Sequence, residues 1–79
     1  MYTSFSAVVK AARHLADRIM EDGTAYMANR ETGTLVRGAA RLVELGIIER
    51  IPCEHRRHYR IVDKEKFKAC ADAYYSMIK

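Results

Sequence analysis

The chain has 79 residues and a formal net charge of +4, and charged side chains occupy 30% of its positions. This length allows one domain with one small core, which excludes a multidomain enzyme, a doubly wound nucleotide-binding fold and a barrel. No stretch approaches the roughly 18 consecutive apolar residues of a membrane-spanning helix, so we expect no contact with a membrane.

A first helix is predicted from about Thr3 to Asp22. Thr3, Ser4 or Ser6 can cap its start, and Gly23 stands where a C-terminal stop belongs. Its apolar residues recur at helical spacing and form a broad stripe, which consists of Phe5, Val8, Val9, Ala12, Leu15, Ala16, Ile19 and Met20.

A short helix is predicted next, from Ala25 to about Arg30. Thr24 can cap it, and Met27 and Ala28 are expected to turn inward. The four residues from Glu31 onward then form a turn and a new cap.

A longer helix is predicted over residues 34–45, ending before Gly46. One side of its helical wheel is apolar, with Leu35, Ala39, Leu42 and Val43. The opposite arc holds Thr34, Arg37, Arg41 and Glu44, flanked by Gly38 and Ala40.

After Gly46 the pattern changes from helical to extended. Residues 47–51 form a short segment rich in β-branched Ile. In residues 58–62 the side chains are expected to alternate between two faces, with Tyr59 and Ile61 on one of them. A polar connection over residues 52–57 joins them, so the pair is predicted to form a two-stranded hairpin.

A last helix is predicted over residues 64–78, capped by Asp63. A small three-helix core leaves its apolar stripe only partly covered, so we expect a homodimer that pairs through this helix. The residues expected at that interface are Phe67, Cys70, Tyr74, Met77 and Ile78.

The positive charge is unevenly distributed. Residues 24–62 carry seven basic side chains, all Arg, against four acidic ones, whereas the four basic residues after position 62 are all Lys. Arg forks onto phosphate and guanine edges, while Lys is a looser point charge, so nucleic acid is the first partner to test.

Residues 24–62 resemble the core of a winged helix-turn-helix domain, similar to bacterial and phage regulators of the multiple-antibiotic-resistance and arsenic-repressor types. The resembling segments are TLVR at the start of the predicted helix over residues 34–45, LVELGIIER at the junction with the hairpin, and RRHYRI in the returning strand. The resemblance implies a mainly α fold with a small β-hairpin: helix, short helix, recognition helix, two-stranded wing and C-terminal helix. The interval between Ala28 and Thr34 is about three residues shorter than the usual turn, so the short helix is expected to be a single turn or displaced.

The resemblance implies a small transcriptional regulator that binds double-stranded DNA. Residues 34–45 would enter the major groove, and the 52–57 wing would reach the backbone or minor groove. Gly38 is costly in a helix, which we explain by close approach of DNA, the alternative being contact with a neighbouring helix. The residues expected to contact DNA are Thr34, Arg37, Gly38, Arg41, Arg50, Arg56, Arg57 and Arg60.

Two other functions remain open from the sequence: a winged-helix protein-interaction module with an acidic partner, and an accessory role in replication or RNA binding. Cys53, His55 and His58 crowd the predicted hairpin tip and raise the alternative of a metal site, but no second ligand pair accompanies them. No arrangement predicts catalysis, so we expect neither enzymatic activity nor a cofactor. Two cysteines do not make a disulfide framework and no secretory signal precedes Lys10, so the expected compartment is the cytoplasm.

Overall fold

Helix α1 (Phe5–Ala16) is the centre of the helical layer, in a computed structural model that describes residues 4–28, 30–54 and 56–77. Ser4 caps it, because its Oγ accepts a hydrogen bond of 3.2 Å from the Ala7 amide. The helix packs against both other helices, and Val9 and Leu15 are fully buried.

The first helix is shorter than the predicted range, which continues to Asp22. The chain must turn back here to enter the sheet, and residues 17–23 form that turn. Asp22 Oδ1 accepts hydrogen bonds from the amide and hydroxyl of Thr24, and Gly23 adopts a φ of +80°. As a result Ile19 and Met20, predicted as core residues of a helix, are exposed.

Residues Thr24–Ala28 form strand β1, so the predicted short helix is wrong. The strand pairs antiparallel with β3 (Arg56–Ile61), and β3 pairs on its other side with β2 (Ile48–Ile51). The predicted hairpin is confirmed, but it belongs to a three-stranded sheet of order β1-β3-β2. Pairing with β3 outweighs the helical tendency of Ala and Met, and the side chains alternate, with Ala25 and Met27 buried.

Helices α2 (Gly33–Glu44) and α3 (Lys64–Met77) lie close to their predicted ranges. The N-cap of α2 is Thr32, whose Oγ1 accepts from the Leu35 amide at 3.4 Å, and Gly46 follows the helix with a φ of +75°. Asp63 caps α3 as expected, since its Oδ1 accepts from the Lys66 amide at 3.0 Å.

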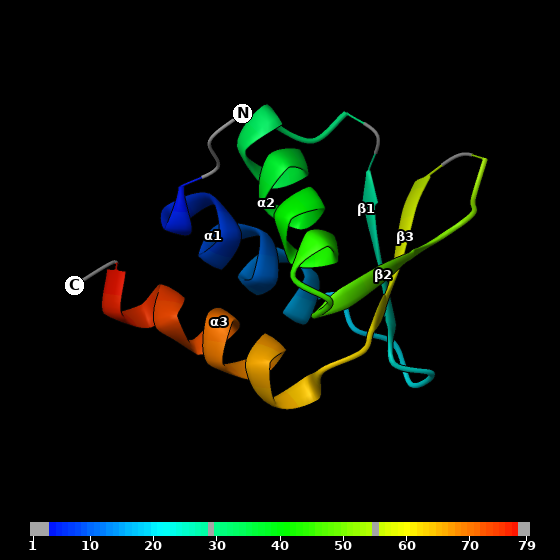
Figure 1. Ribbon diagram of the computed structural model, residues 1–79. Coiled ribbons are helices and arrows are strands. Elements are labelled where there is room, and N and C mark those ends of the chain that lie inside the picture. The colour runs from blue at the N-terminus through cyan, green and yellow to red at the C-terminus, as the bar shows by residue number, and fades with distance from the viewer. Residues whose placement is uncertain (1–3, 29, 55, 78–79) are drawn as a thin grey trace.

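The element order is therefore α1-β1-α2-β2-β3-α3. In Figure 1 the three helices lie to one side of the sheet, and the β2-β3 hairpin extends away from them. Tyr59 and Ile61 of β3 face the helices and join Leu42 and Phe67 in the core. A strand separates α1 from α2, so the described residues contain no pair of consecutive helices joined by a turn.

Candidate nucleic-acid interface

The exposed side of α2 is basic. Arg37, Ala40 and Arg41 are all exposed, while Ala39 and Leu42 on the opposite side are buried. Arg41 Nη1 lies 3.0 Å from Glu44 Oε2, in an exposed ion pair that contributes little stability. Arg37 has no carboxylate partner among the described residues, so its guanidinium is available to a ligand.

Gly38 does not belong to this exposed side, which corrects its expected contact with DNA. It is buried where α2 crosses α1. A Cβ at this position would collide with the backbone carbonyl of Ala7 and with the Cβ of Ala11. The absence of a side chain is therefore required by contact between the two helices, which is the alternative explanation of this glycine.

A small cleft separates α2 from the hairpin. Its volume is about 180 Å³, and it is lined by Val36, Ala40, Val43, Arg50, Arg57 and Tyr59. The strand register pairs Arg50 with Tyr59, and Arg57 precedes Tyr59 by two residues, so both Arg side chains share the face of the sheet that packs on the helices. Two guanidinium groups therefore lie beside the exposed side of α2.

Arg57 is not at the hairpin tip, where its sequence position placed it. It lies within β3 opposite Met27 and is half-buried. Its Nε is buried without a hydrogen-bond partner. Arg50 and Arg57 line the same cleft, and two positive side chains in one cleft are an arrangement that an anionic ligand would stabilise.

Arg56 and Arg60 lie on the opposite face of the sheet. Arg60 Nη1 is 2.7 Å from Glu49 Oε1 on the neighbouring strand, and the Arg56 guanidinium carbon is 5.0 Å from the centre of the Tyr26 ring. The eight residues expected to contact DNA are thus divided. Five surround α2 and its cleft, two lie on the far side of the sheet, and Gly38 is buried.

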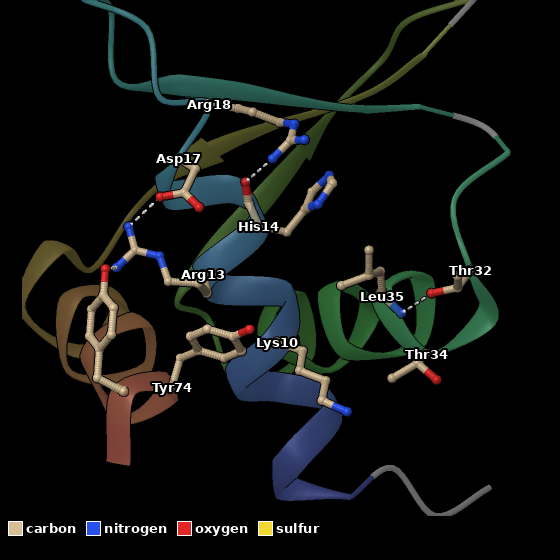
Figure 2. Close-up of a pocket in the computed structure, with 10 residues that line it drawn as sticks. Lys10, Arg13, His14, Asp17, Arg18, Thr32, Thr34, Leu35 and Tyr74 are labelled. Atoms are coloured by element: carbon tan, nitrogen blue, oxygen red, sulfur yellow. Dashed lines mark hydrogen bonds and ion pairs between the residues drawn. The ribbon is translucent and has the colours of Figure 1, made fainter. Parts of the chain in front are cut away.

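A larger cavity of about 650 Å³ opens at the N-terminal end of α2 (Figure 2). Thr32 and Thr34 line it together with Lys10, Arg13 and His14 of α1 and with Arg18 of the turn that follows. We expected no function for these residues from the sequence, although their spacing of three or four residues indicated a shared face. They add positive charge beside the first turn of α2.

Internal contacts hold this basic group in place. Arg13 Nη2 is 2.7 Å from Asp17 Oδ1, its Nη1 donates to the Tyr75 hydroxyl at 3.1 Å, and Arg18 Nη1 donates to the His14 carbonyl at 3.0 Å. Burial lowers the pKa of His14, and the positive charge of Arg18 lowers it further. The neutral imidazole is therefore favoured in this cavity.

The expected dimer residues on α3 are not all on its surface. Phe67 is only 4% exposed, because it packs into the core of its own chain, which corrects its assignment to a dimer interface. Cys70 and Tyr74 are half-buried and Met77 is exposed, while Ile78 lies outside the described residues. Burial raises the pKa of the Cys70 thiol.

The alternative of a metal site gains no support. Cys53 is exposed at the hairpin tip, His58 stacks on Tyr26, and His55 lies outside the described residues. In the described part of the chain, no group of three or more His, Cys, Asp or Glu residues is arranged to hold a metal ion.

Within residues 4–28, 30–54 and 56–77, no helix has the length and apolar character needed to cross a bilayer. In comparisons with known proteins, the chain matches no family model, no curated protein and no solved structure.

Proposed function

We propose that the protein binds double-stranded DNA as a small cytoplasmic transcriptional regulator of the winged-helix type. Helix α2 enters the major groove, and the β2-β3 hairpin lies against the adjacent backbone. One observation carries the proposal. Arg37 and Arg41 on the exposed side of α2 lie next to a cleft that holds Arg50 and Arg57.

The dimensions and charge of this surface suit a duplex. Helix α2 has 12 residues and is about 18 Å long, and Arg37 and Arg41 project from an exposed side on which Ala40 adds little bulk. The major groove is about 12 Å wide and admits such a helix. Of the four guanidinium groups, only that of Arg41 is paired with a described carboxylate.

The four Arg residues have different roles in the proposed complex. Arg37 and Arg41 are four residues apart on α2, so they project together and reach base edges, where an Arg forks onto O6 and N7 of guanine. Arg50 and Arg57 lie beside the helix on the hairpin and contact phosphates. Lys10 and Arg18, beside the first turn of α2, extend the positive surface along the backbone.

The proposed complex contains two copies of the chain. The exposed or half-buried residues of α3, which include Cys70, Tyr74 and Met77, form the contact between them. A two-fold dimer places two α2 helices on successive turns of the major groove, so the binding site is expected to be a palindrome.

The direct test is selection of bound duplexes from a random pool at two salt concentrations. We expect a consensus half-site and an affinity that falls steeply as salt increases. Arg37→Ala should lose affinity for the selected site. Arg60→Ala is the matched control, because it removes the same charge from the far side of the sheet and should change that affinity little. If no duplex is enriched and Arg37→Ala leaves the affinity for DNA unchanged, the protein-interaction function is the better account.

A further inference from the structure

The face of the sheet that points away from the helices carries a row of flat and apolar side chains. The strand register places Tyr26 of β1 and Ile51 of β2 on either side of His58, so the three side chains cross all three strands. None of the described helices covers this face (Figure 1). The row is therefore not covered by a helix and its half-buried side chains remain partly accessible, while α2 and its cleft lie on the other side of the sheet.

The two rings of this row are stacked. The centres of the Tyr26 and His58 rings are 4.0 Å apart, and their planes differ by 12°. The Arg56 guanidinium adds a cation–π contact with Tyr26. Thr24 and Ala28, the neighbours of Tyr26 on the same face of β1, have short side chains, so nothing on that strand rises beside the ring.

We propose that this face binds single-stranded nucleic acid by stacking bases on the group formed by Tyr26, His58 and Arg56. Every base has a π-face, so aromatic rings and Arg planes bind unpaired bases with little sequence preference. The two rings are already parallel, and they stand on strands that pair with each other. Binding of a base therefore costs little side-chain entropy. Strand β3 has six residues and spans about 20 Å, which is enough for two or three bases.

The positive charge on this face favours a nucleic-acid ligand, but it does not explain a preference for unpaired strands. Arg56 has no carboxylate partner among the described residues and can contact a phosphate. Arg60 on the same face is paired with Glu49. With so little free charge, binding here must depend on the bases themselves. A base-paired duplex hides its π-faces and would not use this surface.

The test compares two labelled 12-mers by fluorescence anisotropy. One is oligo-dT, and the other carries abasic sites throughout, so both present the same phosphates. Stacking predicts that oligo-dT binds more tightly than the abasic strand by about 5- to 150-fold for each stacked base. Equal affinity for the two strands would overturn the proposal, because it would leave only an electrostatic interaction.

Variants of the stacked pair make the test specific. Tyr26→Val keeps a residue that favours strands but removes the ring, so it should bring the oligo-dT to abasic ratio close to one. Tyr26→Phe keeps the ring and should retain the ratio. His58→Val provides a second test should Tyr26→Val unfold, and circular dichroism reports the fold of each variant. A preserved ratio in folded Tyr26→Val or His58→Val would overturn the proposal.

A control on α2 separates this inference from duplex binding. Arg37→Ala should lose affinity for duplex DNA while it keeps the oligo-dT to abasic ratio. Tyr26→Val should show the reverse, with duplex affinity kept and the ratio lost. If Arg37→Ala abolishes the ratio, unpaired strands use the α2 surface and the sheet face is not the site.

Discussion

At the scale of single residues, the environment decides what a side chain does. Arg56 and Arg57 are adjacent in sequence, yet one lies over Tyr26 and the other lines the cleft beside α2. They separate because successive residues of a strand point to opposite faces of the sheet. The surroundings of Gly38 and His14 determine the behaviour of these residues in the same way.

Replacing Gly38 with Ala should destabilise the fold by about 1–3 kcal/mol, although Ala normally favours a helix over Gly by up to about 1 kcal/mol. The added Cβ collides with the Ala7 carbonyl, so α1 and α2 must move apart. Urea unfolding measures the change. Gly33→Ala is the control, because its Cβ meets only the end of the Arg37 side chain, which can move, and its effect should stay within about 0.5 kcal/mol. A stabilised Gly38→Ala variant would contradict this packing.

The stability of the fold should fall as the pH decreases below 6.5, the usual pKa of the His14 imidazole. Burial and the nearby Arg18 lower the pKa of His14 in the folded chain, whereas Glu31 and Asp17 act in the opposite direction with smaller effect. The imidazole of His14 therefore binds a proton more readily in the unfolded chain than in the folded one. The contribution of His14 to the free energy of unfolding is fully present above the pKa of the unfolded chain and is lost as the pH falls through the pKa of the folded chain. Thermal unfolding at a series of pH values measures this dependence of stability on pH, and His14→Gln should weaken the dependence. An unchanged slope in that variant would exclude His14 as the cause.

At the scale of secondary-structure elements, β1 shows how pairing overrides local preference. Thr24 and Tyr26 favour a strand, while Ala25, Met27 and Ala28 suit a helix equally well. The partner strand β3 resolves the ambiguity by pairing with residues 24–28 along their whole length.

Met27→Ala should lower the free energy of unfolding by about 2–5 kcal/mol, because Met27 is almost completely buried in the core. Ala28→Gln should change it by less than about 0.5 kcal/mol, since Ala28 is exposed on the other face of β1. A helix with both residues turned inward predicts a large loss from either change. Chemical denaturation of the two variants therefore distinguishes strand from helix.

Arg37→Ala or Arg41→Ala should cost about 1–3 kcal/mol on the selected DNA site and reduce the ratio of specific to non-specific affinity. Arg57→Ala should weaken all duplexes alike and reduce the salt dependence by about one unit, since its place in the cleft suits a phosphate. Binding to the selected site and to random duplex across a salt series measures both effects. If the ratio survives in the α2 variants and is lost in Arg57→Ala, the hairpin is the reading element.

At the scale of the whole molecule, the sheet separates two surfaces of different character. The helical side presents Arg37, Arg41, Arg50 and Arg57, and the far side presents the stacked rings. Helix α3 lies at the edge of the helical layer against α1, and uses Phe67 and Ala71 for that contact, so its other sides remain outside the core (Figure 1).

We expect Met77→Asp to give monomers and weaker binding to a palindromic DNA site. Met77 is 39% exposed at the end of α3, and a carboxylate there would be buried without a partner in the proposed dimer. Sedimentation measures the change. Ser76→Asp is the matched control, because it adds the same charge to an exposed neighbour that lies off the stripe. A wild-type chain that is monomeric at tens of micromolar, about the affinity of a weak regulatory dimer, would exclude the dimer.

Local patterns were sufficient to predict α2, α3 and the β2-β3 hairpin. The caps at Thr32 and Asp63, the glycine after α2 and the alternation around Tyr59 all act within a few residues, so they can be read directly from the chain. The exposed positions of Arg37 and Arg41 follow from the same helical periodicity.

Tertiary contacts decided the remainder. Residues 17–28 became a turn and a strand because β3 offers β1 a partner, and the paired residues of that strand lie 28 to 36 positions further along the chain. The same pairing brought Tyr26 onto His58, directed Arg57 into the cleft and left Arg56 on the far face. Gly38 is buried because α1 crosses α2 at that point. These outcomes depend on which distant residues pack together, whereas a local pattern shows only which faces are available for packing.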